Sequence, residues 1–306
     1  MSLVDFTTQL AGITLRNPLI TSSGTYGFGE EYTAYCPLET LGGITLKGLT
    51  PQPRLGNSVP RLAETPAGLL NAVGLENPGL EEFIKSYLPK VRKMPTAVIA
   101  NISGFSLEDY AQMARALKKD SGLAALEVNI SCPNVKHGGM HFGTDPRSAE
   151  EVIAVVKAET ALPVIAKLSP NVTDIVEMAK AVQRGGADAL SLINTLLGMR
   201  IDPETQRPVL ANTFGGLSGP AIRPVAVRMV WQVAEAVDLP IIGMGGIVNW
   251  QDAVEFLLAG ATAVSIGTGN FYNPLAPIEI LKGIESYCVQ RGLSSLRDLV
   301  GLAHKR

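Results

Sequence analysis

Short runs of apolar residues recur along the chain, and most of them are continuous rather than alternating. A continuous run of about four to eight apolar, β-branched residues is typical of a strand buried on both faces of a sheet. We therefore predict eight strands, over residues 19–22, 43–46, 97–102, 124–130, 164–168, 189–193, 240–243 and 261–266.

Helical patterns with polar start signals separate these runs. Ser148 with Glu151 has the spacing of a full capping box, and Asn249 with Asp252 begins another helix. Eight strand–helix steps in a chain of 306 residues place the protein in the α/β class. The predicted architecture is a (β/α)8 TIM barrel.

A doubly wound open sheet is the alternative architecture. A GxGxxG turn after the first strand would favour it. The glycines within residues 24–29 have the wrong spacing, and residues 243–246 lack the third glycine. The barrel is therefore preferred.

The connections between the predicted strands are unequal. About fifty residues separate strands two and three, and a similar number separate strands six and seven. Both long connections follow the C-terminal ends of strands, where the active sites of barrels lie. We expect insertions after strands two (50–78), four and six (196–218) to cover the C-terminal face; inert surface elaboration is the alternative for either long insertion alone.

Composition and charge exclude several classes of protein. Hydrophobic residues make up 46% of the chain, which is enough for one large core, so residues 1–306 are expected to form a single domain. A net charge of −2 with scattered basic residues argues against nucleic-acid binding. No signal peptide and no apolar stretch of roughly 18 residues is visible, so we expect no membrane span and a cytoplasmic location.

Polar side chains interrupt the apolar runs where the strands are predicted to end; they are Lys47, Asn101, Asn129, Lys167 and Asn194. A buried ammonium is costly unless an anion meets it. No acidic residue is expected at the neighbouring strand ends, so an anionic ligand is the simplest explanation. Two alternatives exist: each Asn could be an ordinary turn former, and a Schiff-base aldolase would also use a lysine at a strand end. Three Asn side chains together suit a flat heterocycle with carbonyl and N–H groups, because each amide offers a donor and an acceptor.

Cys132 lies just beyond the fourth strand, on a loop. A Cys in this position is placed for proton chemistry, although a buried apolar filler is the competing interpretation. His137 and His141 follow at a spacing that could suit a metal, but the glycines between them argue against a helix. We therefore expect lid residues and no metal site.

Glycine-rich loops follow the last two predicted strands, at Gly245–Gly246 and at Gly267–Thr268. In barrels these two loops often bind phosphate through backbone N–H groups. A phosphorylated ligand inside the barrel is implied, and flavin mononucleotide (FMN) fits. A phosphate-binding barrel without redox activity is the alternative.

Motifs along nearly the whole chain match one known family. They lie at residues 45–48, 71–79, 101–104, 127–134, 166–171, 193–195, 215–220, 243–247 and 266–271. On these segments the chain resembles the dihydroorotate dehydrogenases. The resemblance implies oxidation of (S)-dihydroorotate to orotate in de novo pyrimidine biosynthesis, with hydride passed to FMN.

The resemblance also implies a role for individual residues. FMN contacts are expected at Ser23, Lys47, Gly48, Asn101, Asn129, Lys167, Ile193 and Gly219, with its phosphate on Gly245, Gly246, Gly267 and Thr268. Orotate contacts are expected at Lys47, Asn71, Ala72, Val73, Gly74, Leu75, Asn129, Asn194 and Thr195. Cys132 would be the general base that removes the C5 proton, and Lys167 would stabilise the reduced flavin.

Within the family, a Cys base marks the class I enzymes, and residues 71–79 resemble the NAD-linked class IB branch. The resemblance therefore implies a heterotetramer, in which a catalytic homodimer binds two electron-transfer subunits that carry FAD and a [2Fe–2S] cluster. The three Cys of this chain, at 36, 132 and 288, cannot supply the four thiolates of a cluster, which agrees with a cluster in another polypeptide. Gly269 departs from the Ala expected there and should loosen its loop. A fumarate-linked class IA enzyme and a related FMN dihydropyrimidine reductase are the alternatives.

Overall fold

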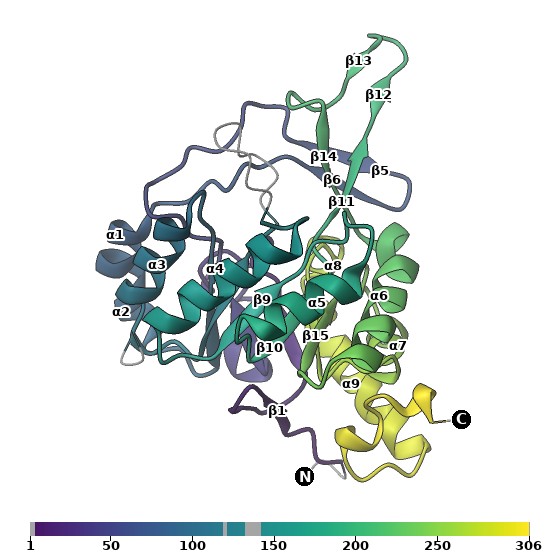
Figure 1. The fold of residues 1–306 in the computed structure, drawn as a ribbon. Coiled ribbons are helices and arrows are strands. Elements are labelled where there is room, and N and C mark those ends of the chain that lie inside the picture. Colours follow the sequence, from purple (N-terminus) through teal and green to yellow (C-terminus); the bar gives the residue numbers. More distant parts are fainter. Residues whose placement is uncertain (1–3, 119–120, 132–141, 306) are drawn as a thin grey trace.

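The computed structural model describes residues 4–118, 121–131 and 142–305. Eight of its strands are β3 (Leu19–Thr21), β4 (Gly43–Thr45), β7 (Ala97–Ile102), β8 (Ala125–Asn129), β9 (Val164–Lys167), β10 (Ala189–Leu192), β15 (Ile241–Met244) and β16 (Ala263–Ile266). They pair in parallel and close into a barrel in the order β10–β15–β16–β3–β4–β7–β8–β9 (Figure 1). The predicted barrel is confirmed, and the open doubly wound sheet is excluded because both edges are paired.

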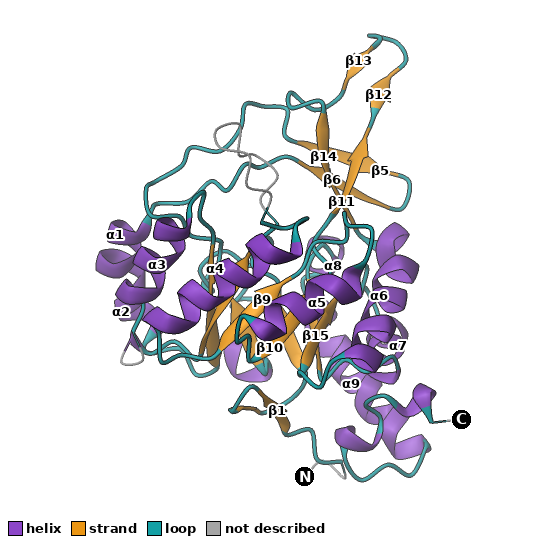
Figure 2. Ribbon diagram, in the orientation of Figure 1, coloured by secondary structure: helices purple, strands orange, loops and turns teal. Residues whose placement is uncertain are grey.

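Helices surround the barrel (Figure 2). They are α1 (Leu80–Glu82), the π-helical turn η2 (Phe83–Tyr87), α2 (Leu88–Val91), α3 (Leu107–Ala116), α4 (Pro146–Glu159), α5 (Ile175–Arg184), α6 (Arg223–Ala236), α7 (Trp250–Leu258), α8 (Gly269–Tyr272) and α9 (Ala276–Gln290). Short 3-10 turns occur at η1 (Leu38–Thr40), η4 (Pro220–Ile222), η5 (Leu296–Asp298) and η6 (Leu302–His304). No helix in the described ranges is long and apolar enough to cross a membrane.

The helix starts follow the side-chain chemistry of their first residues. Asn249 and Asp252 begin α7 as predicted, and their side chains form a full capping box. The capping box predicted at Ser148 is wrong, because the N-cap of α4 lies three residues earlier. Asp145 is its N-cap and accepts a hydrogen bond from the backbone N–H of Ser148 at 2.8 Å. Asp is a strong N-cap and Pro146 is favoured in the first helical position, so this start is preferred.

Side chains of the barrel strands alternate between the barrel interior and the surrounding helices. One interior layer is apolar and forms a separate core cluster that includes Ile20, Ile99, Ala125, Ile165, Ala189 and Ala263. Two residues further along the same strands, and therefore on the same face, the side chains are polar: Ser22, Asn101, Glu127, Lys167, Ser191 and Ser265. The interior thus changes from apolar to polar toward the C-terminal ends of the strands.

A short antiparallel hairpin closes the opposite end of the barrel. It consists of β1 (Thr8–Leu10) and β2 (Ile13–Leu15), and it lies at the lower end of the molecule in Figure 1. Leu10 and Leu15 are fully buried and belong to the same apolar cluster as Ile20 and Ile99. The apolar layer and the hairpin together fill the N-terminal end of the barrel.

The two long insertions combine in one antiparallel sheet. Its strands are β5 (Leu62–Thr65) and β6 (Gly68–Asn71) from the first insertion, and β11 (Leu196–Met199) and β14 (Phe214–Ser218) from the second. They pair in the order β11–β14–β6–β5, and we call them the roof sheet. A hairpin of β12 (Ile201–Asp202) and β13 (Arg207–Pro208) projects from it (Figure 1).

Leu70 of β6 is 2% exposed and packs with Ala63 and Leu210 in a small core of the roof sheet. We expect Leu70→Ala to destabilise this sheet by about 2–5 kcal/mol, because truncation leaves a cavity. Hydrogen exchange should rise in β5, β6 and β14 while the barrel strands stay protected. Leu62→Ala, at a 54% exposed position of the same sheet, is the matched control and should change little. Equal exchange in both variants would contradict this prediction.

Candidate active site

A buried carboxylate lies at the centre of the polar interior layer. The side chain of Glu127, from β8, is 2% exposed. Its Oε2 accepts a hydrogen bond from Asn101 Nδ2 at 2.6 Å and lies 3.5 Å from Lys167 Nζ. Its Oε1 accepts a hydrogen bond from Ser191 Oγ at 2.8 Å. The side chains of four neighbouring strands, β7 to β10, therefore converge on one anion.

The prediction that no acidic residue meets the two lysines is wrong for Lys167. Glu127 lies inside the apolar run of β8, two residues before its end, where only buried core residues were predicted. A charged residue in such a run was the available signal, since alternation places it on the same face as Asn129. Lys47 differs: its half-buried side chain has no ion pair with a described residue.

Lys167 and the first strand ends form one side of the site. The Lys167 side chain is 8% exposed, and its ammonium donates to Ser23 Oγ at 3.4 Å. Lys47 follows β4, and its backbone N–H donates to Gly27 O at 2.8 Å. A Cβ at Gly48 would lie only 2.8 Å from Asn101 Oδ1, so glycine is needed for this approach.

Asn129 and Asn194 form the other side of the site. Asn194 Nδ2 donates to Asn129 Oδ1 at 3.4 Å, and Asn194 Oδ1 accepts from the Thr195 backbone N–H at 2.8 Å. Ile193, between the end of β10 and Asn194, is buried. The pairing brings together the predicted substrate residues at the end of β8 and just after β10.

The loop of residues 71–75 reaches the site from the roof sheet. Asn71 Nδ2 donates to Gly216 O at 3.2 Å. Asn57 holds the next two residues, because its side chain donates to Ala72 O and its backbone N–H donates to Val73 O, both at 2.9 Å. A Cβ at Gly48 would lie 3.6 Å from Leu75 Cδ2, so the end of this loop meets the end of β4.

Two side chains that the sequence analysis did not select hold the candidate substrate residues. One is Asn57. The other is Asn171, whose Nδ2 donates to Thr195 O at 3.0 Å and whose Oδ1 accepts from the Leu197 backbone N–H at 2.8 Å. An Asn that bridges two loops has no distinct sequence signal, because it resembles an ordinary turn residue.

The loops after β15 and β16 present unpaired backbone donors. The N–H groups of Gly245, Gly246, Gly267 and Thr268 donate to no other residue in the described part of the chain. Gly245 and Gly246 have φ values of 127° and 79°, which favour glycine. Thr268 Oγ1 donates to Ser218 Oγ at 2.7 Å, next to Gly219 at the end of β14. Such an array of free N–H groups fits an anion such as a phosphate.

Gly269 fits its position more tightly than the sequence suggested. A Cβ at this residue would lie 2.4 Å from Ile247 O. An Ala would therefore force the two loops apart, so glycine permits their close packing here rather than loosening the loop.

Cys132, His137 and His141 lie outside the described residues. Ser131, the residue before Cys132, donates through its Oγ to Lys167 O at 3.4 Å. The remaining cysteines, Cys36 and Cys288, are free and buried, and burial raises the pKa of both thiols. Among the described residues, no group of three His, Cys, Asp or Glu side chains could hold a metal ion.

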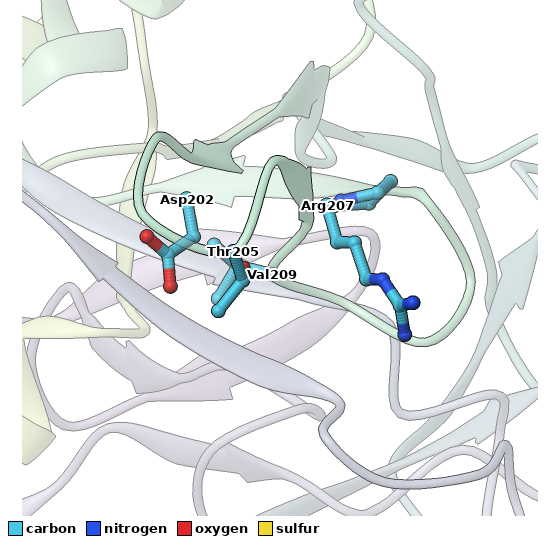
Figure 3. Close-up of a pocket in the computed structure, with 5 residues that line it drawn as sticks. Asp202, Thr205, Arg207 and Val209 are labelled. Atoms are coloured by element: carbon cyan, nitrogen blue, oxygen red, sulfur yellow. The ribbon is translucent and has the colours of Figure 1, made fainter.

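Two pockets lie near the roof sheet. One is lined by Asp202, Thr205, Arg207, Pro208 and Val209 on the projecting hairpin, away from the barrel strand ends (Figure 3). The other, of about 510 Å³, lies between the β5–β6 turn and α8 and includes Thr268, Phe271 and Tyr272 in its wall. Only the second adjoins the free N–H groups.

Residues 5–288 match the family model described as dihydroorotate dehydrogenase. The chain belongs to the dihydroorotate dehydrogenase family. It is 57% identical over 296 residues to the dihydroorotate dehydrogenase B (NAD(+)) catalytic subunit of Desulforamulus reducens, covering 97% of each chain. The proteins of the same name from Citrifermentans bemidjiense and Geotalea uraniireducens are 56% and 55% identical over 297 residues, again with 97% of each chain covered.

The resemblance inferred from the sequence motifs is therefore confirmed, and a non-redox phosphate-binding barrel is not favoured. Dihydroorotate dehydrogenases of this kind use FMN, and the described site has the donors that FMN would need. Free N–H groups suit its phosphate, and amide and ammonium groups suit its polar ring edge. The names of the relatives also do not favour the fumarate-linked alternative.

Gly48→Ala should weaken FMN binding in this dihydroorotate dehydrogenase, because the added methyl group pushes the Asn101 amide away from the end of β4. We expect at least a tenfold rise in the dissociation constant of FMN, about 1.4 kcal/mol. Gly24→Ala is the matched control, since its Cβ would meet nothing within 4 Å. Fluorescence titration of the apoproteins with FMN measures both; equal affinities in the two variants would contradict the close contact.

Proposed function

We propose that this chain oxidises (S)-dihydroorotate to orotate in de novo pyrimidine biosynthesis, as a single FMN-binding barrel over residues 1–306. The observation that carries the proposal is the placement of ammonium and amide side chains at the same barrel end as four free backbone N–H groups. The side chains suit a polar heterocycle and its carboxylate, and the backbone N–H groups suit a phosphate.

FMN would be held by residues from most of the strand ends: Ser23, Lys47, Gly48, Asn101, Asn129, Lys167, Ile193 and Gly219, with the phosphate on Gly245, Gly246, Gly267 and Thr268. When bound, it supplies the acceptor for the hydride that leaves C6 of dihydroorotate. Lys167 would place a positive charge beside the ring and stabilise its reduced, anionic form.

The substrate would be bound by Lys47, the 71–75 loop, Asn129, Asn194 and Thr195. The Lys47 ammonium, which has no ion-pair partner among the described side chains, would meet the substrate carboxylate. The amides of Asn129 and Asn194 would bind the ring N–H and C=O groups, since each amide offers a donor and an acceptor. This set favours the acid over a dihydropyrimidine without a carboxylate.

Cys132 would remove the C5 proton as the general base. The proposal rests on the family resemblance and on the position of this residue, three after the end of β8. A thiolate near neutral pH is a stronger base than a hydroxyl group. Cys132 is therefore better suited than Ser to this step.

We further propose that the protein works as a homodimer with an electron-transfer subunit that carries FAD and a [2Fe–2S] cluster, and that NAD⁺ is the final acceptor. Relatives named as catalytic subunits of an NAD(+) enzyme support this division of labour. So does the burial of Cys36 and Cys288, which leaves too few thiolates for a cluster in this chain. A cytoplasmic location remains a prediction from the sequence.

The purified chain should carry FMN, and anaerobic dihydroorotate should bleach its flavin absorbance with release of orotate. Cys132→Ser should retain FMN but bleach about 10²–10⁴-fold more slowly near neutral pH, because it loses the better base. Stopped-flow absorbance measures both rates. A colourless chain would overturn the proposed function, and a variant as fast as the wild type would overturn the role of Cys132.

Lys47→Ala should weaken orotate binding at least tenfold, because the carboxylate loses its ammonium partner. Orotate titration of the FMN-loaded protein, followed by the flavin spectrum, gives the dissociation constants. Lys93→Ala, at an exposed position, is the control and should bind orotate like the wild type. An unchanged affinity in Lys47→Ala would rule out this contact.

A further inference from the structure

Glu127 takes no part in the proposed reaction, yet it is the most enclosed charge of the site. Its carboxylate is buried below the strand-end residues, and each of its oxygens has a partner from a different strand. A buried, fully partnered carboxylate inside a barrel has a cost of desolvation that hydrophobic residues would avoid. Its neighbours indicate what it does.

Two of its partners, Lys167 and Asn101, are residues that would contact FMN. The ammonium of Lys167 lies 3.5 Å from Glu127 Oε2, and the amide of Asn101 donates to the same oxygen at 2.6 Å. One oxygen therefore fixes both a cation and an amide that face the cofactor. The third partner, Ser191 Oγ, donates to the other oxygen at 2.8 Å, so both carboxylate oxygens are hydrogen-bonded.

The remaining groups around Lys167 are neutral. Ser23 Oγ accepts from its ammonium at 3.4 Å, and Ser131 contacts only its backbone carbonyl. Glu127 is thus the one anion paired with Lys167 among the described residues. The charge that a bound flavin would meet at this place is the sum of the ammonium and the carboxylate behind it.

We propose that Glu127 is a positioning residue that orients Lys167 and Asn101 toward FMN and sets the reduction potential of the flavin by balancing the lysine charge. This inference rests on the proposed function, because it requires FMN above Lys167. The Lys167 charge favours the reduced, anionic flavin, and the Glu127 charge opposes it. Removal of the Glu127 charge alone should therefore favour the reduced form.

Glu127→Gln makes this change with little other disturbance. The amide oxygen can still accept from Asn101 and Lys167, and the amide nitrogen can donate to Ser191 Oγ. We expect the ratio of the dissociation constants of oxidised and reduced FMN to rise at least tenfold. For a two-electron couple, this corresponds to a midpoint potential about 30 mV more positive.

Anaerobic reductive titration against a reference dye gives the potential, and titration of the apoprotein gives the affinity for oxidised FMN. Ser191→Ala removes a hydrogen bond to the same carboxylate but keeps its charge, so its potential should match the wild type. Glu151→Gln, at an exposed position on α4, is the control for the substitution itself and should also leave the potential unchanged. A purely structural Glu127 would alter thermal stability without altering the ratio.

An unchanged potential in Glu127→Gln would overturn the electrostatic role while the wild type still binds FMN and reacts with dihydroorotate. A wild type without FMN would instead overturn the proposed function. Should Glu127→Gln fail to fold, Glu127→Asp tests the positioning role, because it keeps the charge but withdraws it by one methylene group. We expect Glu127→Asp to bind oxidised FMN at least tenfold more weakly, and wild-type affinity would overturn the inference.

Discussion

The ion pair between Lys167 and Glu127 is the interaction on which the upper half of the barrel depends. A lone ammonium or carboxylate at this depth would cost several kcal/mol, so each residue stabilises the other in its position. Asn101, Ser191 and Ser23 add further hydrogen bonds to the pair. The pair stands directly above an apolar interior layer, which keeps water out from below and strengthens the electrostatic interactions above it.

The roof sheet also holds the loops of the candidate site in place. Its strands come from insertions that are far apart in the sequence, and they meet because each leaves the barrel at a C-terminal strand end. Asn71 donates to Gly216 within the sheet, and the Thr268 hydroxyl donates to Ser218, which ties the sheet to the loop after β16. The residues proposed to bind substrate and those proposed to bind phosphate thus share one rigid support.

The periodicity of the sequence was sufficient to predict the barrel, because continuous β-branched runs separated by capped helices have few other solutions. The sequence also predicted which polar side chains gather near the C-terminal strand ends, since each interrupts such a run: Lys47, Asn101, Asn129, Lys167 and Asn194. Their contacts with FMN and orotate stay predictions. Glu127 was missed because it is surrounded by apolar residues within a strand, and only the pairing of β8 with β9 brings it to Lys167. The pairing of the two insertions was likewise not predictable, as it is a contact between distant segments whose local patterns are weak. The start of α4 was predicted at the wrong residue for a local reason: Asp145 and Ser148 are both suitable N-caps, and the sequence does not show which one the helix uses.

The β1–β2 hairpin has a kinetic consequence. Leu10 and Leu15 close the lower end of the barrel, and helices cover its wall, so the interior opens in one direction only. A substrate bound at the strand ends would then enter, and its product would leave, through the same opening. Two molecules cannot use one opening at once, so each product molecule would have to leave before the next substrate molecule binds. A small hairpin far from the site would in this way help to determine the order of product release and substrate entry.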